Sequence, residues 1–225
     1  MWHSYHIFRP RPHERFLVDE LKPFVESTPH EAFFFIRYNV PADHIRLRLK
    51  SDGDLDARVL QAFPDAEIVE YVPEVERYVH IEVAERQFEL SSRAVLEAMS
   101  RPDWSYELAL SVAMRMHLDL AEAFALDARS FFGRTMKRFL RAPDVPRDPE
   151  AEARRLAEFD ARPLEPAPRN VRWLEAMRGI ARDFGNTELN AIQSFVHMTN
   201  NRLGIRYFDE AFIARKLELG VRSST

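Results

Sequence analysis

The stretch HIRLRLK, residues His44 to Lys50, alternates basic or protonatable residues with aliphatic ones. Side chains of a β-strand point alternately to its two faces, so the stretch predicts a strand whose aliphatic residues face the core. His44, Arg46 and Arg48 then share the other face, with successive Cβ atoms about 7 Å apart. Guanidinium groups stay charged and bind carboxylates through paired hydrogen bonds. The face is therefore either a solvated surface or a site for carboxylates.

The residues on both sides of this strand predict the rest of a sheet. Runs of aromatic and β-branched residues indicate further strands, and apolar residues at helical spacing indicate helices between them. The order strand, helix, strand, strand, helix, strand predicts an α+β fold with a ferredoxin-like βαββαβ sheet and helices on one face. The other expected elements are strands at Trp2–Phe8, Ala32–Tyr38 and Glu67–Tyr71, and helices at His13–Glu26 and Leu55–Phe63.

From about residue 84 onward the pattern is helical, and we expect one domain over residues 1–225 with a sheet part at 1–83 and a mainly helical part at 84–225. A proline-rich connector is expected near residues 143–168, which hold six of the 14 prolines. The expected helices are Ala84–Met99, Tyr106–Phe124, Ala128–Leu140, a short charged one at Glu150–Phe159, Val171–Phe184 and Thr187–Arg202.

Composition excludes several classes of function. A net charge of −4 argues against direct nucleic-acid binding, which usually requires a basic domain. Without cysteine the chain has no disulfide, thiolate nucleophile or cysteine-ligated metal. The sequence has no HExxH or similar histidine spacing, so it does not predict a metal site. We see neither a signal peptide nor a long apolar span, and we expect a cytoplasmic protein with no membrane contact.

Two other stretches carry candidate functional residues. In YVPEVERY, Glu74 and Arg77 are three residues apart and would share the face of a helical turn. In FVHMTNNRLG, His197 lies on a helix whose neighbouring face is rich in amides, Asn201 among them, and Gly204 is suited to end that helix. A surface ion pair and a structural histidine are the simpler interpretations of these residues.

Together the stretches FFFIRY, HIRLRLK, YVPEVERY and HMTNNRLG occur in the order and approximate spacing of a known family. They resemble the C-terminal elimination domain of LanB-type lantibiotic dehydratases, a domain that stands alone in the split dehydratases of thiopeptide-type bacteriocin pathways. The opening WHSYHIF and the segment AERQFELSS are similar as well. The resemblance covers nearly the whole chain and is weakest near the proline-rich connector.

The resemblance implies a lyase that works after a partner protein. The partner uses glutamyl-tRNA to esterify serine or threonine of a ribosomally made precursor peptide, and the elimination domain expels glutamate to leave dehydroalanine or dehydrobutyrine. Its ligand is thus the glutamylated peptide, and it needs no cofactor or metal. A homodimer or a complex with a separate glutamylation protein is expected. Family residues match Arg46, Arg48, Glu74, Arg77 and His197.

From this match we expect Arg46, Arg48, Arg77 and His197 to be catalytic, and His44, Glu74 and Asn201 to bind substrate. The arginines would clamp the carboxylate charge of the departing glutamate. His197 would act as a general acid or a general base, and the sequence leaves open which of the two. We expect Arg46 and Arg48 to project toward Arg77, with His197 facing the same space.

Two departures and two alternatives accompany this hypothesis. The usual RYGG reads RYVH at Arg77–His80, and Leu90 stands where an acidic residue usually precedes Ser91. One alternative is the pyridine-forming [4+2] cycloaddition enzyme of thiopeptide pathways, which shares the fold but tends to carry RK and WRLR where this chain has IRY and HIRLR. The other is a non-catalytic scaffold that binds the precursor peptide.

Overall fold

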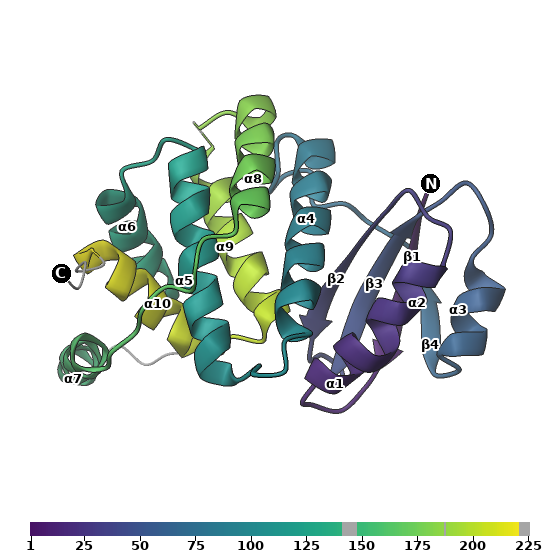
Figure 1. Ribbon diagram of the computed structural model, residues 1–225, viewed down its shortest axis with the longest axis horizontal. Coiled ribbons are helices and arrows are strands. Elements are labelled where there is room, and N and C mark those ends of the chain that lie inside the picture. The colour runs from purple at the N-terminus through teal and green to yellow at the C-terminus, as the bar shows by residue number, and fades with distance from the viewer. Residues whose placement is uncertain (141–147, 187, 221–225) are drawn as a thin grey trace. The chain divides into compact units, whose positions relative to one another are not determined.

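The computed structural model describes residues 1–140, 148–186 and 188–220. The chain divides into two compact units, Met1–Trp104 and Ser105–Thr225, each with its own core. The first holds the β-sheet and the second is helical (Figure 1).

The first unit is built on an antiparallel sheet with the strand order β2-β3-β1-β4. In β3, Arg46 lies between His6 of β1 and Ile36 of β2, and Arg48 lies between Ser4 and Phe34. Three strands have the expected bounds, while the last begins and ends earlier than expected. The strands are β1 (Trp2–Phe8), β2 (Ala32–Tyr38), β3 (His44–Lys50) and β4 (Ala66–Val69).

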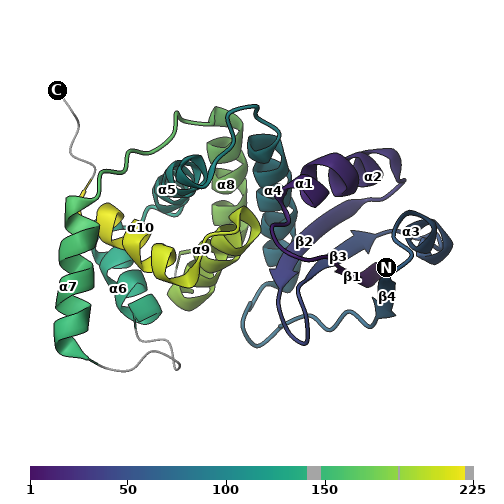
Figure 2. The same cartoon turned by 90° about the horizontal axis from the view of Figure 1, so that it is seen from below.

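One face of this sheet is covered by helices, as Figures 1 and 2 show. The expected helix His13–Glu26 is present as one helical stretch with a π-helical turn at its centre, and its buried leucines Leu17 and Leu21 face the sheet core. Tyr5 of β1 donates a hydrogen bond to Asp56 at the start of the next helix, over 2.8 Å. The helices are α1 (Glu14–Phe16), η1 (Leu17–Leu21), α2 (Lys22–Ser27) and α3 (Asp56–Ala62).

The helix α4 (Ile81–Met99) also belongs to the first unit. It packs beside β2, where the backbone N–H of Phe35 donates to Ser92 Oγ over 3.2 Å and the rings of Phe34 and Phe88 lie 5.3 Å apart. The two compact units therefore divide after Trp104. The expected helix Ala84–Met99, assigned from the sequence to the mainly helical part, belongs to the unit that holds the sheet.

The second unit contains α5 (Tyr106–Ala123), α6 (Ala128–Leu140), α7 (Pro149–Ala161), α8 (Val171–Phe184), α9 (Leu189–Leu203) and α10 (Tyr207–Leu219). Side chains cap several helix starts: Ser105 accepts from the N–H of Leu108, and Asn170 from that of Trp173. The expected charged helix in the connector is present as α7, which lies beside α10 (Figure 2). Residues 141–147 of the expected connector lie outside the described residues.

The last helix, α10, was not predicted from the sequence. Its buried residues run consecutively from Asp209 to Ala214, so its apolar positions do not repeat at the spacing of an amphipathic helix. Phe212 is fully buried, and the ring of Phe159 on α7 lies 5.3 Å from its ring. The helix is therefore held by contacts on more than one side, a pattern that periodicity does not detect.

The glycine that ends α9 provides a test of the fold. Gly204 has φ 77° and ψ 21°, a left-handed conformation in which a Cβ atom is strained. We predict that Gly204→Ala lowers the free energy of unfolding by about 1 kcal/mol. Gly179→Ala is the control, because Gly179 lies inside α8 and an added Cβ would meet only Arg182, at 3.9 Å.

That control should leave stability equal or raise it by about 0.5–1 kcal/mol, since alanine favours the helix. Urea unfolding of both variants measures the difference. Equal effects of the two substitutions would contradict the conformational explanation.

Candidate functional site

The strand face that carries the basic residues of β3 is buried. Of its side chains, His44 is fully buried and Arg48 is 7% exposed. Arg46 is half-buried. The face is therefore not a solvated surface, and we call it the arginine face, made up of Ser4, His6, Phe34, His44, Arg46 and Arg48.

Neighbouring rings and carbonyl groups position the two guanidinium groups. The Arg46 guanidinium lies 3.5 Å from the centroid of Tyr38, and its Nε donates to His44 Nε2 over 3.3 Å. Because His44 Nε2 accepts this bond, His44 Nδ1 carries the proton and donates it to the carbonyl of Ala42 over 2.7 Å. Arg48 lies 5.7 Å from the centroid of Tyr71 and donates to the carbonyl of Leu47.

Among the described residues, no carboxylate forms an ion pair with Arg46 or Arg48. Burial, followed by the charge of Arg46, lowers the pKa of Arg48 to about 10, so Arg48 remains a cation at neutral pH. Buried charges are usually paired because leaving water is costly. The buried Arg48 and the half-buried Arg46, without a carboxylate partner in the described chain, therefore make this face a candidate site for an anion.

Two polar side chains of β1 complete the arginine face. His6, whose ring lies 4.7 Å from that of His44, has its pKa lowered to about 4 by burial and then by the charges of Arg48 and Arg46. Ser4, opposite Arg48 in the sheet, is 2% exposed, and its Oγ has no hydrogen-bond partner. A neutral imidazole and a free hydroxyl thus adjoin the two cations.

The segment after β4 is fixed to α4 beside this face. The Tyr71 hydroxyl donates to Glu85 Oε1 over 2.8 Å, and the indole of Trp2 donates to Glu85 Oε2 over 2.9 Å. Burial, followed by the bond to Glu85, raises the pKa of Tyr71 far above its ordinary value. The Glu85 carboxylate is thereby held by two neutral donors, and Tyr71 stays a neutral ring over Arg48.

Glu74 and Arg77 follow Tyr71 and form an ion pair with 3.0 Å between Oε2 and Nη1. Arg77 is 34% exposed and Glu74 62%, so the pair contributes little to stability. Glu74 also acts on Tyr71, where its charge helps to raise the pKa of the hydroxyl. The pair therefore adjoins the ring that covers Arg48.

In the second unit, His197 on α9 meets a buried carboxylate of α10. Its Nδ1 lies 2.9 Å from Oε2 and 3.0 Å from Oε1 of Glu210, which is 3% exposed. Asn200 Nδ2 donates to the same carboxylate over 3.2 Å, and Asn200 Oδ1 lies 2.8 Å from Nε2 of the buried His117. His197 itself is 32% exposed.

The donors and acceptors of this network determine its protons. Because Asn200 presents its amide oxygen to His117, His117 carries its proton on Nε2, and burial lowers its pKa to about 4. Burial raises the pKa of Glu210, against the opposite effect of its bonds to His197 and Asn200. An ionised Glu210 accepts from both neighbours, which places a proton on His197 Nδ1 and leaves Nε2 with a lone pair.

The first unit thus brings together Arg46, Arg48 and His44. That Arg46 and Arg48 project toward Arg77 stays a prediction, and so does the expectation that His197 faces the arginines. Asn201 lies in the last turn of α9, where its carbonyl accepts from the N–H of Gly204, and the neighbouring asparagine is the one bonded to Glu210.

Sequence reasoning missed several residues of both networks. The helix that carries Glu210 gave no periodic signal, and the hydroxyl of Tyr71 has its acceptor 14 residues further along the chain. No local pattern joins such residues. The missed residues are Ser4, His6, Tyr71, Glu85, His117, Asn200 and Glu210.

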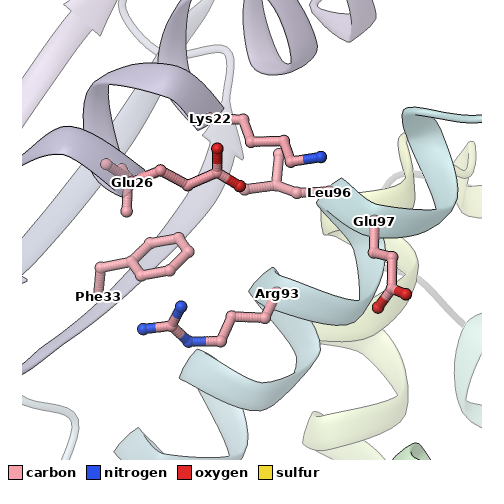
Figure 3. A pocket seen from close by; sticks show the side chains of 7 residues that line it. Lys22, Glu26, Phe33, Arg93, Leu96 and Glu97 are labelled. Carbon is pink, nitrogen blue, oxygen red and sulfur yellow. The ribbon is translucent and has the colours of Figure 1, made fainter.

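A pocket of about 230 Å³ lies elsewhere in the first unit, between α2, β2 and α4 (Figure 3). Phe33 lines it beside Arg93, whose guanidinium is 4.8 Å from the ring centroid. Since Phe33 is opposite Leu49 in the sheet, the pocket is on the face away from Arg48. Its cations have partners, because Arg93 donates to Glu89 and Lys22 to Ser100. It is separate from the candidate site.

Comparison with known protein families shows which family the chain belongs to. The family described as "Lantibiotic biosynthesis dehydratase C-term" matches residues 2–219. The chain belongs to this family. No curated protein sequence matches it. Within the described ranges no helix is long and apolar enough to cross a membrane, and no group of histidine and carboxylate side chains is arranged to hold a metal ion.

Solved structures of related fold include a dehydratase and a pyridine synthase. One is the tRNA-dependent lantibiotic dehydratase MibB from Microbispora sp. 107891, with TM-score 0.64 and 20% identity over 95% of this chain, which spans 27% of MibB. The others are the pyridine synthase TbtD from thiomuracin biosynthesis (TM-score 0.61, 14% identity, 98% of each chain) and TsrL (0.60, 15%, 98% of this chain and 96% of TsrL). At such identities the likeness is one of fold.

From the lowered pKa of His6 we predict how its imidazole titrates. The imidazole should stay neutral until the pH falls to about 4, compared with an ordinary value of 6.5. Between these values the unfolded chain binds a proton that the folded chain does not, so this residue makes stability fall as the pH falls from 6.5 toward 4. Histidine NMR titration measures the pKa.

Arg48→Met should raise the pKa of His6, because the positive charge that opposes protonation is removed. His13 is the internal control: burial lowers its pKa too, but Arg48 is not among the charges that act on it. A His6 resonance that titrates near 6.5 in the unaltered protein would contradict the described environment.

Proposed function

We propose that this chain eliminates glutamate from glutamylated serine or threonine of a ribosomally synthesised precursor peptide, leaving dehydroalanine or dehydrobutyrine. The observation that carries the proposal is the buried Arg48 beside the half-buried Arg46, two cations without a carboxylate partner in the described chain. Membership of the dehydratase family and the fold shared with MibB support it.

The elimination develops negative charge that these arginines would stabilise. A base removes the α-proton of the esterified residue, the Cβ–O bond breaks as the Cα=Cβ double bond forms, and the bonding electrons leave on the ester oxygen. The departing glutamate then carries a new carboxylate as well as that of its side chain. Arg46 and Arg48, with Arg77 beside them, would bind these carboxylates, and fixed cations in a site of low polarity stabilise such charge well.

His197 is the base in this proposal. With Nδ1–H bonded to Glu210, its Nε2 has the free lone pair that can take the α-proton. Glu210 acts as a positioning residue, since it fixes the tautomer and stabilises the imidazolium that forms. Glu74 would meet the ammonium group of the glutamyl moiety or orient Arg77, and His44 positions Arg46. We include Asn201 as a substrate-binding residue on the family resemblance alone.

A pyridine-forming cycloaddition is the second candidate. TbtD and TsrL match this chain over nearly their whole lengths, whereas MibB is a far longer protein. Cycloaddition of two dehydroalanines releases no glutamate. It therefore does not require two unpaired guanidinium groups to bind a departing carboxylate. We therefore favour elimination, and a non-catalytic peptide scaffold ranks below both because it leaves the His197–Glu210 pair without a role.

The remaining expectations accompany this proposal. A separate glutamyl-tRNA-dependent protein would supply the esterified peptide, and both would act in the cytoplasm, this chain as a homodimer or in complex with that protein. The strand order β2-β3-β1-β4 with antiparallel neighbours supports a ferredoxin-like type for the sheet.

The first test replaces the planar guanidinium while it keeps the charge. Arg46→Lys and Arg48→Lys should each lower kcat for elimination by about 10²-fold, because lysine binds a carboxylate as a point charge and loses the two-pronged contact. Mass spectrometry should show glutamylated peptide accumulating. Arg93→Lys, in the separate pocket, is the matched control and should eliminate at the unaltered rate. Lysine variants as fast as the parent would count against the proposal.

The second test concerns the histidine. His197→Ala should lower kcat by about 10²–10⁴-fold if it acts as general base. Glu210→Gln should lower kcat less, because the imidazole remains but the charge that stabilises its protonated form is lost. Asp209→Asn, a neighbouring buried carboxylate bonded to Tyr106, is the control for the loss of a buried charge in α10.

That control should lower stability but not kcat. A His197→Ala variant with full activity would mean that the histidine is structural and that the base lies elsewhere.

A further inference from the structure

The segment between β4 and α4, residues 70–80, exposes an unusual set of side chains, and we call it the valine loop. Val72, Val75 and Val79 are 72%, 55% and 60% exposed. Exposed aliphatic residues that gather in this way mark interaction sites more often than scattered ones do.

The valine loop is held at two points, so its valines are not simply left over from an unformed segment. Tyr71 is bonded to Glu85, and Tyr78 is 3% exposed with its ring 5.0 Å from that of Phe88; both partners belong to α4. Between them the N–H groups of Arg77 and Tyr78 donate to the carbonyl of Glu74, which closes a single turn. The backbone around the valines is thus held in place while their apolar side chains remain exposed to water.

Carboxylates are interspersed among these valines. Glu70 and Glu76 in the loop and Glu67 on β4 are all exposed. In the described part of the chain none of the three forms an ion pair, while Glu74 is occupied by Arg77. The surface is therefore apolar and acidic, next to a face that is cationic.

We propose that the valine loop binds the segment of the peptide substrate that flanks the esterified residue, and that this segment carries apolar and basic side chains. The inference rests on the proposed function, because it takes the arginine face as the site of the glutamyl group. The loop adjoins that face directly: Tyr71 at its start covers Arg48.

Charge and continuity select this occupant. A glutamyl ester is attached to a side chain, so the peptide backbone must continue across the surface beside the arginines. There it meets valines that can bury aliphatic side chains and carboxylates that attract lysine or arginine while they repel acidic residues. A second copy of this chain fits less well, since a two-fold contact through the loop would place its carboxylates against their own copies.

The experiment compares two glutamylated test peptides, one with valine and lysine beside the modified serine and one with glutamate in place of each lysine. We expect the lysine peptide to have a KM at least about tenfold lower. Glu70→Lys/Glu76→Lys should reverse this preference. Val72→Asp/Val75→Asp should raise KM for the lysine peptide about tenfold with little change in kcat, because each valine loses an apolar contact. Val171→Asp is the control, since Val171 is 59% exposed on α8 of the other unit.

Binding of the same peptides without the glutamyl group, measured by fluorescence anisotropy, separates the two proposals. If the loop variants bind and react like the parent protein while elimination proceeds, the loop inference is overturned and the proposed function stands. If the lysine peptide binds through the loop but no glutamate is released, the proposed reaction fails and the docking surface remains. Equal KM values for the two peptides would also overturn the inference.

Discussion

Arg48 is buried and Arg46 half-buried on one face of β3, and within the described residues no carboxylate neutralises them; the candidate site depends on this constraint. Removing a charge from water is costly, and proteins usually offset it with an opposite charge. Here the guanidinium of Arg48 lies by the ring of Tyr71 and donates to the carbonyl of Leu47, and that of Arg46 lies over the ring of Tyr38 and donates to His44. A carboxylate at this place would stabilise the fold but would also occupy the position that an anionic ligand needs.

Two acidic residues of the first unit, Glu85 and Glu74, are bonded to side chains other than Arg46 and Arg48. The two oxygens of the Glu85 carboxylate accept hydrogen bonds from Tyr71 and Trp2. Glu74 is paired with Arg77. His6 stays neutral at ordinary pH because burial and the two arginines oppose its protonation. Within the described residues no carboxylate is paired with Arg46 or Arg48, and the second unit holds a histidine, His197, whose Nδ1 is bonded to Glu210.

The sequence could predict the elements better than their surroundings. The bounds of β1, β2 and β3 followed from alternation and apolar runs, which are local properties of a strand. The burial of Arg48 did not follow, because it depends on a tyrosine that returns from beyond β4. Likewise α4 was recognised as a helix, but periodicity does not say which partner a helix packs against.

The same distinction applies to the second unit. His197 was found by resemblance and its helix by periodicity, whereas α10 was missed because its buried residues are consecutive and include Asp209 and Glu210. A buried acidic residue in such a stretch has no local signature. Its partner is identified only when the two helices are seen side by side.

The central claim is that this chain releases glutamate from an esterified peptide. The most direct measurement gives the purified protein two substrates in parallel, a glutamylated precursor peptide and a precursor that already carries dehydroalanines, and follows both by mass spectrometry. The account predicts loss of glutamate from the first, with free glutamate in equal amount, and no change in the second. Conversion of the second peptide to a macrocycle with release of its leader, and an unaltered first peptide, would contradict it.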